Sequence, residues 1–230
     1  MGEGRLEVAA LSARAGGRDV LADIAFGAET GEIVAVVGPN GAGKTTLLEC
    51  LAGLRPSSGE IRFGGRSLHS FADRAAVISY MPDEVELPNE TSVAVALGIE
   101  SSPYAAQLEI ANLLGVRGSE LSRGEQKRCL LCAAFDAERP VILLDEPLGA
   151  FDPRQLRALL PVLRDVAKAR AIVLTVHQMR SAELAADRIV MLASGRIIAS
   201  GTVGALRDRA GLTDAPFDDV FLALLDEAPR

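Results

Sequence analysis

The segment at residues 38–45, GPNGAGKT, carries the clearest chemical pattern in the chain, because it matches G-x-x-x-x-G-K-[ST]. Its glycines allow backbone N–H groups to surround phosphate oxygens, and a helix beginning near Lys44 would add its positive end. We expect Lys44 to bind the β- and γ-phosphates of a nucleotide and the Thr45 hydroxyl to bind Mg²⁺. The predicted phosphate-binding residues are Gly38, Pro39, Asn40, Gly41, Ala42, Gly43, Lys44, Thr45 and Thr46.

Two adjacent carboxylates, Asp145 and Glu146, follow the apolar run at residues 141–144. That run predicts a buried strand, and in a parallel sheet its carboxyl end lies at the same edge as the phosphate-binding loop. Asp145 can then reach Mg²⁺, and Glu146 can polarise the water that attacks the γ-phosphate. Taken alone, the pair would fit a solvated strand end equally well. Together with residues 38–45 it predicts a hydrolytic nucleotide site.

A third motif, LSRGEQ at residues 121–126, opens the helix predicted before the Asp145 strand. Ser122 and Glu125 have the spacing of a capping box, which is a sufficient structural reason for both residues. The motif also resembles the LSGGQ signature of ABC ATPases. The segment at residues 146–152 is similar to the D-loop of that family, and His177, after a predicted strand, resembles its switch histidine. These motifs follow the order of the family across almost the entire chain.

The resemblance identifies the chain as an ABC transporter ATP-binding subunit of the bacterial exporter type with a separate membrane subunit. It implies an α/β fold with a P-loop NTPase core, a parallel central sheet, an N-terminal antiparallel β flank and a small helical subdomain insertion. It also implies a head-to-tail pair, either a homodimer or a heterodimer with a related ATPase chain. Glu146 and His177 would be catalytic, and the ATP of one chain would meet the partner's signature residues, which are Ser122, Arg123, Gly124 and Glu125.

Three features depart from the family pattern. Asp83 follows a predicted strand where the family usually has Gln; its carboxylate can bind Mg²⁺ or its water, but it adds negative charge near the γ-phosphate. In the signature, Arg123 replaces a Gly and Glu125 replaces the Gln. Residues 13–16 contain no aromatic side chain to stack on adenine, so Arg14 is the alternative and weak discrimination between bases is expected.

Apolar periodicity predicts strands that alternate with helices. The expected strands are residues 5–11, 20–26, 33–37, 61–63, 77–81, 141–144, 171–176, 188–192 and 196–200. The expected helices are residues 44–54, 92–99, 104–114, 122–137, 154–167, 180–185 and 217–225. The predicted domains are an ATP-binding core at residues 1–83 and 121–230 and an inserted helical subdomain at residues 84–120.

Composition disfavours several other kinds of protein. The net charge is −7 and no cluster of Lys and Arg is present, so nucleic acid is not an expected partner. No apolar run approaches the roughly 20 residues of a membrane span. We therefore expect a cytoplasmic chain, peripheral on the cytosolic face of the cell membrane, bound to a separate integral permease subunit. Cys129 and Cys132 lie inside a predicted buried helix, which favours core packing over redox chemistry.

The C-terminal segment at residues 217–225 predicts a helix with one apolar face. Such a helix could dock on its own domain or provide a dimer or partner surface. Its sequence is similar to the tails of exporter ATPases with a separate membrane subunit, which favours export. The alternative function is a soluble ABC-type ATPase acting on chromosomes or ribosomes. Relatives of that kind carry long coiled-coil insertions or two ATPase units, and neither is present here.

Overall fold

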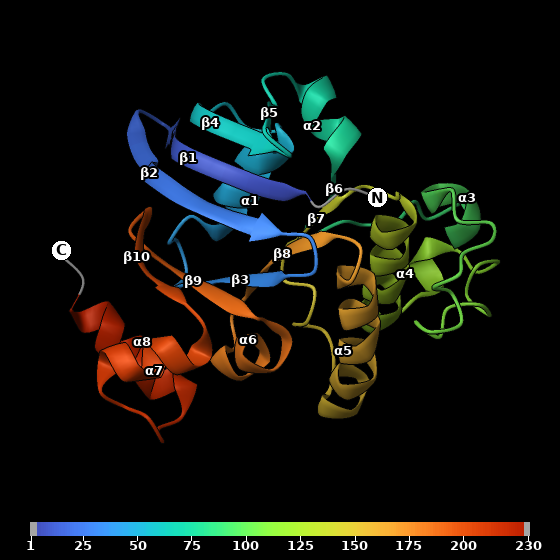
Figure 1. Cartoon of the computed structure of the whole chain (residues 1–230). Coiled ribbons are helices and arrows are strands. Elements are labelled where there is room, and N and C mark those ends of the chain that lie inside the picture. The colour runs from blue at the N-terminus through green and yellow to red at the C-terminus, as the bar shows by residue number, and fades with distance from the viewer. Residues whose placement is uncertain (1–3, 228–230) are drawn as a thin grey trace.

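The computed structural model describes residues 4–227, in which ten strands form two sheets (Figure 1). The strands are β1 (Arg5–Ala15), β2 (Arg18–Glu29), β3 (Ile33–Val37), β4 (Ser58–Phe63), β5 (Arg66–Ser67), β6 (Ile78–Met81), β7 (Val141–Leu144), β8 (Ala171–Val176), β9 (Arg188–Ala193) and β10 (Arg196–Gly201). The helices are α1 (Lys44–Ala52), α2 (Phe71–Val77), α3 (Val93–Leu97), α4 (Arg123–Asp136), α5 (Pro153–Ala167), α6 (Met179–Ala185), α7 (Val203–Ala210) and α8 (Phe217–Asp226).

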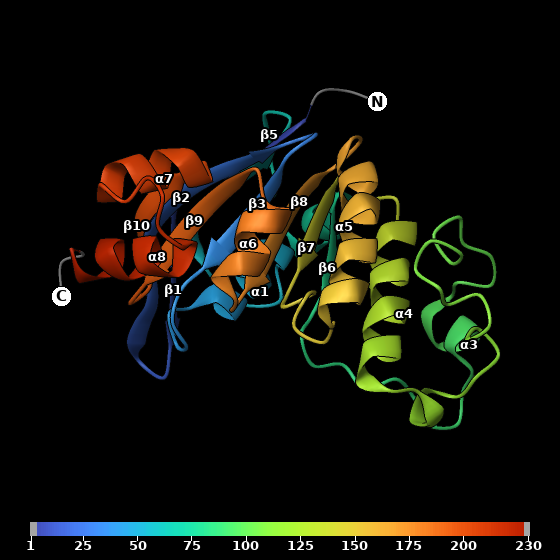
Figure 2. The same cartoon turned by 90° about the horizontal axis from the view of Figure 1, so that it is seen from below.

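The larger sheet has the order β10-β9-β3-β8-β7-β6 and is parallel except for β10. Its central strand β3 is buried at every position, because the sheet is covered on both faces. Val34 and Val36 belong to the apolar cluster that contains α1, whereas Ile33, Ala35 and Val37 belong to the cluster that contains α4, α5 and α6. Figure 2 shows these last three helices along one face of the sheet. The predicted α/β fold is confirmed.

The carboxyl ends of β3, β8, β7 and β6 are in register at one edge of this sheet. The phosphate-binding loop follows β3, Asp83 follows β6, Asp145 follows β7 and His177 follows β8. Parallel pairing therefore brings residues that are up to 139 positions apart (38 to 177) to one edge. This is the position at which open α/β sheets bind their ligands.

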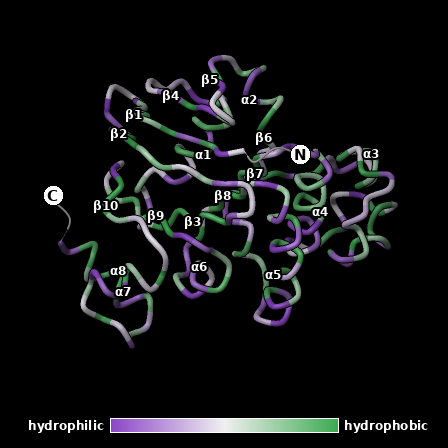
Figure 3. Tube along the Cα trace, in the orientation of Figure 1, coloured by the Kyte–Doolittle hydropathy of each residue, from purple (hydrophilic) through white to green (hydrophobic). Residues whose placement is uncertain are grey.

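The smaller sheet, β2-β1-β4-β5, is antiparallel and forms the predicted N-terminal flank. β1 and β2 are joined by the expected turn at Gly16 and Gly17, both of which have positive φ angles. Helix α1 packs between the two sheets, and its buried leucines belong to the same apolar cluster as β1 and β2. The hydropathy colouring of Figure 3 shows apolar stretches along the inner strands of the larger sheet, around β3, β7 and β8.

Residues 84–120 differ from the prediction in one respect. The expected helix at residues 92–99 is present as the short α3, but the helix expected at residues 104–114 is wrong, because that stretch is a series of turns. Glu109 has a φ angle of 55°, which interrupts a right-handed helix, while Leu108 and Ile110 are buried nonetheless. The apolar periodicity of this stretch therefore reflects packing against α4 rather than helix formation.

Helix α8 docks on its own chain, as one of the two sequence interpretations expected. Phe217, Val220, Phe221 and Leu224 are buried and belong to the same apolar cluster as α6. Cys129 and Cys132 are fully buried in α4, and burial raises the pKa of Cys129 to about 12, so core packing is confirmed for both thiols. Within residues 4–227, no helix is both long enough and apolar enough to cross a bilayer.

Candidate functional site

The phosphate-binding loop connects β3 to α1 along a path that requires glycine. Gly43 precedes α1 with a φ angle of 104°, and a Cβ atom there would lie 2.8 Å from Leu21. At Gly38 a Cβ atom would lie 2.1 Å from the Leu192 carbonyl oxygen. Any side chain at either position would displace the loop. The loop can therefore keep its backbone N–H groups together at the N-terminus of α1.

Lys44 is only 7 % exposed, and its ammonium group lies over the loop. Its Nζ donates to the Gly38 carbonyl at 2.8 Å and to the Pro39 carbonyl at 3.4 Å. Burial lowers the pKa of Lys44, and the carboxylates of Glu146 and Asp145 oppose that shift. A polyphosphate bound here would add negative charge beside a poorly solvated cation, which is the combination that gives strong charge-assisted hydrogen bonds.

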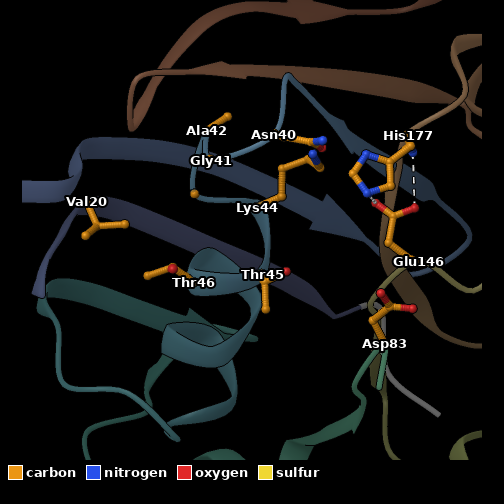
Figure 4. A pocket seen from close by; sticks show the side chains of 11 residues that line it. Val20, Asn40, Gly41, Ala42, Lys44, Thr45, Thr46, Asp83, Glu146 and His177 are labelled. Atoms are coloured by element: carbon orange, nitrogen blue, oxygen red, sulfur yellow. Dashed lines mark hydrogen bonds and ion pairs between the residues drawn. The ribbon is translucent and has the colours of Figure 1, made fainter. Parts of the chain in front are cut away.

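A cavity of about 390 Å³ opens above the loop and gathers most of the predicted site (Figure 4). In Figure 4, Lys44, Glu146 and His177 surround it, Asp83 lies below Glu146, and Thr46 extends toward the side of Val20. The predicted residues that line the cavity are Asn40, Gly41, Ala42, Gly43, Lys44, Thr45, Thr46, Asp83, Glu146 and His177. Gly38 and Pro39 lie beneath Lys44, where their carbonyl groups accept its hydrogen bonds.

Asp145 is next to Glu146 in the chain, is 1 % exposed and does not line the cavity. Its Oδ1 accepts a 2.5 Å hydrogen bond from Thr175, while its buried Oδ2 has no hydrogen-bond partner among residues 4–227. A buried carboxylate oxygen without a donor suits a cation or a cation-bound water, so these residues fit Mg²⁺. Among the described residues, no group of three or more acidic, His or Cys side chains is arranged to hold a metal ion by itself, and Mg²⁺ usually completes its shell with phosphates and water.

Glu146 and His177 form a contact pair at the edge of the cavity. The His177 backbone N–H donates to Glu146 Oε2 at 3.1 Å, and His177 Nε2 lies 3.3 Å from Oε1 without hydrogen-bond alignment. Glu146 has a φ angle of 47°, a strained conformation for a non-glycine residue, and its N–H donates to Thr175 at 2.8 Å. Strain that is held by such bonds is common at active sites.

The charge state of Glu146 follows from its surroundings. Burial raises the pKa of this carboxyl group, the charges of His177 and Lys44 oppose the rise, and the carboxylates of Asp145 and Asp83 add to it. A carboxylate with a raised pKa is a better proton acceptor than an ordinary one when it is ionised. The arrangement can therefore position a water molecule next to a base and a cation-bound phosphate.

The residues at the start of α4 do not join this cavity. The Ser122 hydroxyl accepts from the Glu125 backbone N–H at 3.4 Å and the Ser122 backbone N–H donates to Glu125 Oε2 at 2.9 Å, so the predicted capping box is present. The Ser122 hydroxyl also donates to Glu125 Oε2 at 2.6 Å. Arg123 is exposed and lines a neighbouring cavity of about 690 Å³, which shares Asp83, Glu146 and His177 with the first. Gly124 and Glu125 line neither cavity. Within one chain, the two halves of the predicted site are therefore separate.

Sequence reasoning missed three residues of the site. Val20 lines the cavity from β2, Thr175 holds both Asp145 and Glu146, and Lys127 contacts Asp83 and the Asp145 carbonyl. Thr175 could have been found, because it is a polar residue in an otherwise apolar strand. Lys127 could have been suspected as a lysine on the buried side of a helix. Val20 gives no sequence signal.

The structure does not place Arg14 where it was expected to stack on a nucleotide base. Its side chain is 70 % exposed and engaged with Asp19 at 3.0 Å, and it does not line the cavity. Among the residues that the structure describes, His177 is the one aromatic side chain in the cavity lining, and Val20 offers only a small apolar contact.

We therefore expect weak discrimination between bases, since the described residues place no Phe, Tyr or Trp in the cavity lining to stack on a base. GTP and ATP should compete for the site with dissociation constants within about tenfold of each other, because one hydrogen bond is worth about that factor. Competition of unlabelled GTP and ATP against a fluorescent ATP analogue measures this ratio. A preference for ATP of a hundredfold or more would contradict the expectation.

The fold and the cavity define the class of protein as a P-loop ATPase with an α/β core. Residues 21–149 match the family described as ABC transporter, so the chain belongs to that family, as an ATP-binding subunit with ATPase activity coupled to transport.

Individual relatives agree with this assignment. The chain is 30 % identical over 242 residues to the hemin import ATP-binding protein HmuV of Rhizobium etli, covering 94 % of this chain and 90 % of that protein. It is 34 % identical over 216 residues to the ATP-dependent lipid A-core flippase of Burkholderia pseudomallei, covering 85 % of this chain and 36 % of the flippase. A solved structure of an ATP-binding subunit of an ABC transporter superposes with a TM-score of 0.83 at 29 % identity, covering 96 % of this chain and 99 % of that one.

Proposed function

We propose that this chain hydrolyses ATP as one half of a head-to-tail dimer that closes on two Mg-ATP molecules and drives movement through a separate membrane subunit. The observation that carries the proposal is the separation of the site into two halves. Lys44, Glu146 and His177 line one cavity, whereas Ser122 and the first turn of α4 do not line it. A second chain would bring its Ser122 helix to the phosphates held by the first. The dimer is a homodimer or contains a related ATPase chain.

Each half of the site has a defined task in this proposal. The loop residues 38–46 bind the phosphates, with Lys44 as the fixed charge, while Thr45, Asp145 and Asp83 hold Mg²⁺, which supplies charge neutralisation at the β- and γ-phosphates. Glu146 accepts the proton of the attacking water, and His177 hydrogen-bonds the γ-phosphate. The partner's signature residues, from Ser122 to Glu125, complete the site. Ser122 must then exchange its bond to Glu125 for a bond to phosphate.

Coupling to the membrane subunit would use residues 84–120, which we assign as an inserted subdomain, made mostly of turns with the short helix α3, between the two parts of the ATP-binding core. Val95 of α3 is 67 % exposed and offers an apolar contact on this segment. The chain would thus lie on the cytosolic face of the membrane. We propose export, on the similarity of the α8 segment to exporter tails; the named relatives include an import protein and a flippase, so they support neither direction alone.

The proposal is tested by isolating the affinity-tagged chain from detergent-solubilised membranes in the presence of Mg-ATP. We expect an integral membrane protein with several spans to co-purify in stoichiometric amount and to be absent from untagged controls. Ribosomes, chromosomal DNA or soluble proteins alone in the eluate would contradict the proposal and support an ATPase that works away from membranes.

A further inference from the structure

Lys127 is a buried cation that the proposed chemistry does not use. It lies in the second turn of α4, and its side chain is 7 % exposed. Its ammonium group donates to three oxygens: Asp83 Oδ1 at 2.9 Å, the Asp83 carbonyl at 3.0 Å and the Asp145 carbonyl at 3.4 Å. One side chain therefore ties α4 to the carboxyl ends of both β6 and β7, beside the nucleotide cavity.

The cavity is bordered by more carboxylates than lysine or arginine side chains. Asp83, Asp145 and Glu146 place three carboxylates beside the position proposed for a polyphosphate. Among the described residues that line the cavity, Lys44 is the one lysine. Negative charges that are close together in a partly buried site repel one another. Asp83 is close enough to Glu146 that its charge contributes, after burial and the charge of Asp145, to the raised pKa of Glu146. A carboxylate at position 83 would thus repel the phosphates to the extent that neither Mg²⁺ nor a cation of the protein offsets its charge.

We propose that Lys127 is a positioning residue that neutralises Asp83 and holds its carboxylate at the edge of the nucleotide cavity. The Asp83 side chain is 46 % exposed, so without Lys127 it would be free to turn into solvent or toward the phosphates. The contact also joins the cavity to α4, whose N-cap residue Ser122 is proposed to meet the nucleotide of a second chain. The inference rests on the proposed function, because it assumes that Mg-nucleotide occupies this cavity.

A double-mutant cycle tests the inference directly. Purified wild-type protein, Lys127→Met, Asp83→Asn and the double variant are titrated with a fluorescent ATP analogue in Mg²⁺, and the dissociation constants are compared. We expect Lys127→Met to weaken binding at least about tenfold in the wild-type background, because it leaves Asp83 unneutralised. In the Asp83→Asn background the same substitution should weaken binding less than about threefold, because no charge remains to offset.

Two results would overturn the inference. An equal loss in both backgrounds would mean that Lys127 acts independently of Asp83, and no loss in either would mean that it does not act on the site. If Lys127→Met does not fold, as judged by thermal unfolding, Lys127→Gln takes its place with the same expected results, since it keeps a donor but no charge. Failure of the wild-type chain to bind the analogue would instead overturn the proposed function as well.

The matched control is the exposed pair Lys168 and Asp165, whose Nζ–Oδ1 distance is also 2.9 Å. Lys168→Met, Asp165→Asn and their double variant should each bind the analogue within about twofold of wild type, because exposed ion pairs contribute little and this one is outside the cavity.

Discussion

Replacing Glu146 with Gln should reduce the rate of ATP hydrolysis at least about a hundredfold while nucleotide binding persists. The substitution keeps the shape of the side chain and its contact with the His177 backbone, but it removes the proton acceptor. General-base catalysis typically contributes 10²–10⁴-fold, which sets the expected size. Because ATP would then remain bound, the closed dimer should accumulate.

Two measurements test this prediction. Steady-state phosphate release gives the rate, and size-exclusion chromatography in Mg-ATP reports the dimer as a larger species than in the absence of nucleotide. Glu138→Gln is the matched control, because Glu138 is exposed and has a φ angle of 51°, close to that of Glu146. If Glu146→Gln hydrolyses ATP at the wild-type rate, the assignment of the base is wrong.

The pH dependence of the wild-type rate belongs to the same prediction. Glu146 accepts a proton only when it is ionised, so hydrolysis should decline as pH falls through its pKa. Burial raises that pKa, so the decline should begin at a higher pH than for an ordinary glutamate. A rate that is flat down to the pH at which an exposed glutamate is protonated would contradict a buried base.

Replacing Lys44 with Ala should weaken binding of Mg-ATP by roughly 10- to 150-fold, the factor that corresponds to losing a charged hydrogen bond worth about 1.5–3 kcal/mol. Lys44 is the buried cation of the phosphate-binding loop, and its ammonium group lies where β- and γ-phosphates are expected. The loss should appear in the affinity, because the interaction exists before any bond is broken.

Equilibrium titration with a fluorescent ATP analogue measures the affinity, and thermal unfolding without nucleotide checks that the variant is folded. Lys168→Ala removes a lysine from the surface and should leave the affinity unchanged. If Lys44→Ala binds Mg-ATP as tightly as the wild type, the cavity above the loop is not the nucleotide site.

Local sequence determined most of the fold and one half of the chemistry. The loop at residues 38–45 can be recognised because its function requires backbone approach and a fixed lysine, which only particular residue types at particular spacing provide. β3, β7 and β8 were predicted with the correct bounds, because a strand buried on both faces is a continuous apolar run. The start of helix α4 could likewise be predicted from its Ser122–Glu125 capping box.

The errors lie where local pattern and tertiary packing disagree. The stretch at residues 104–114 has helical apolar spacing but forms turns, because Leu108 and Ile110 reach the core without a continuous helix. Conversely, α2 was not expected, because it buries none of its residues and so has no apolar face to read; its signal is the capping box of Ser70 and Asp73.

Only the tertiary structure decided which residues share the site. Lys127 and Asp83 are 44 positions apart and meet because α4 packs against the end of β6, while Thr175 reaches Asp145 and Glu146 through the pairing of β7 with β8. No local sequence pattern predicts either contact, because both contacts depend on the order of the strands and on the direction in which a helix crosses the sheet. Sequence specifies the groups that can do chemistry, whereas their charge and orientation depend on neighbours that long-range packing alone supplies.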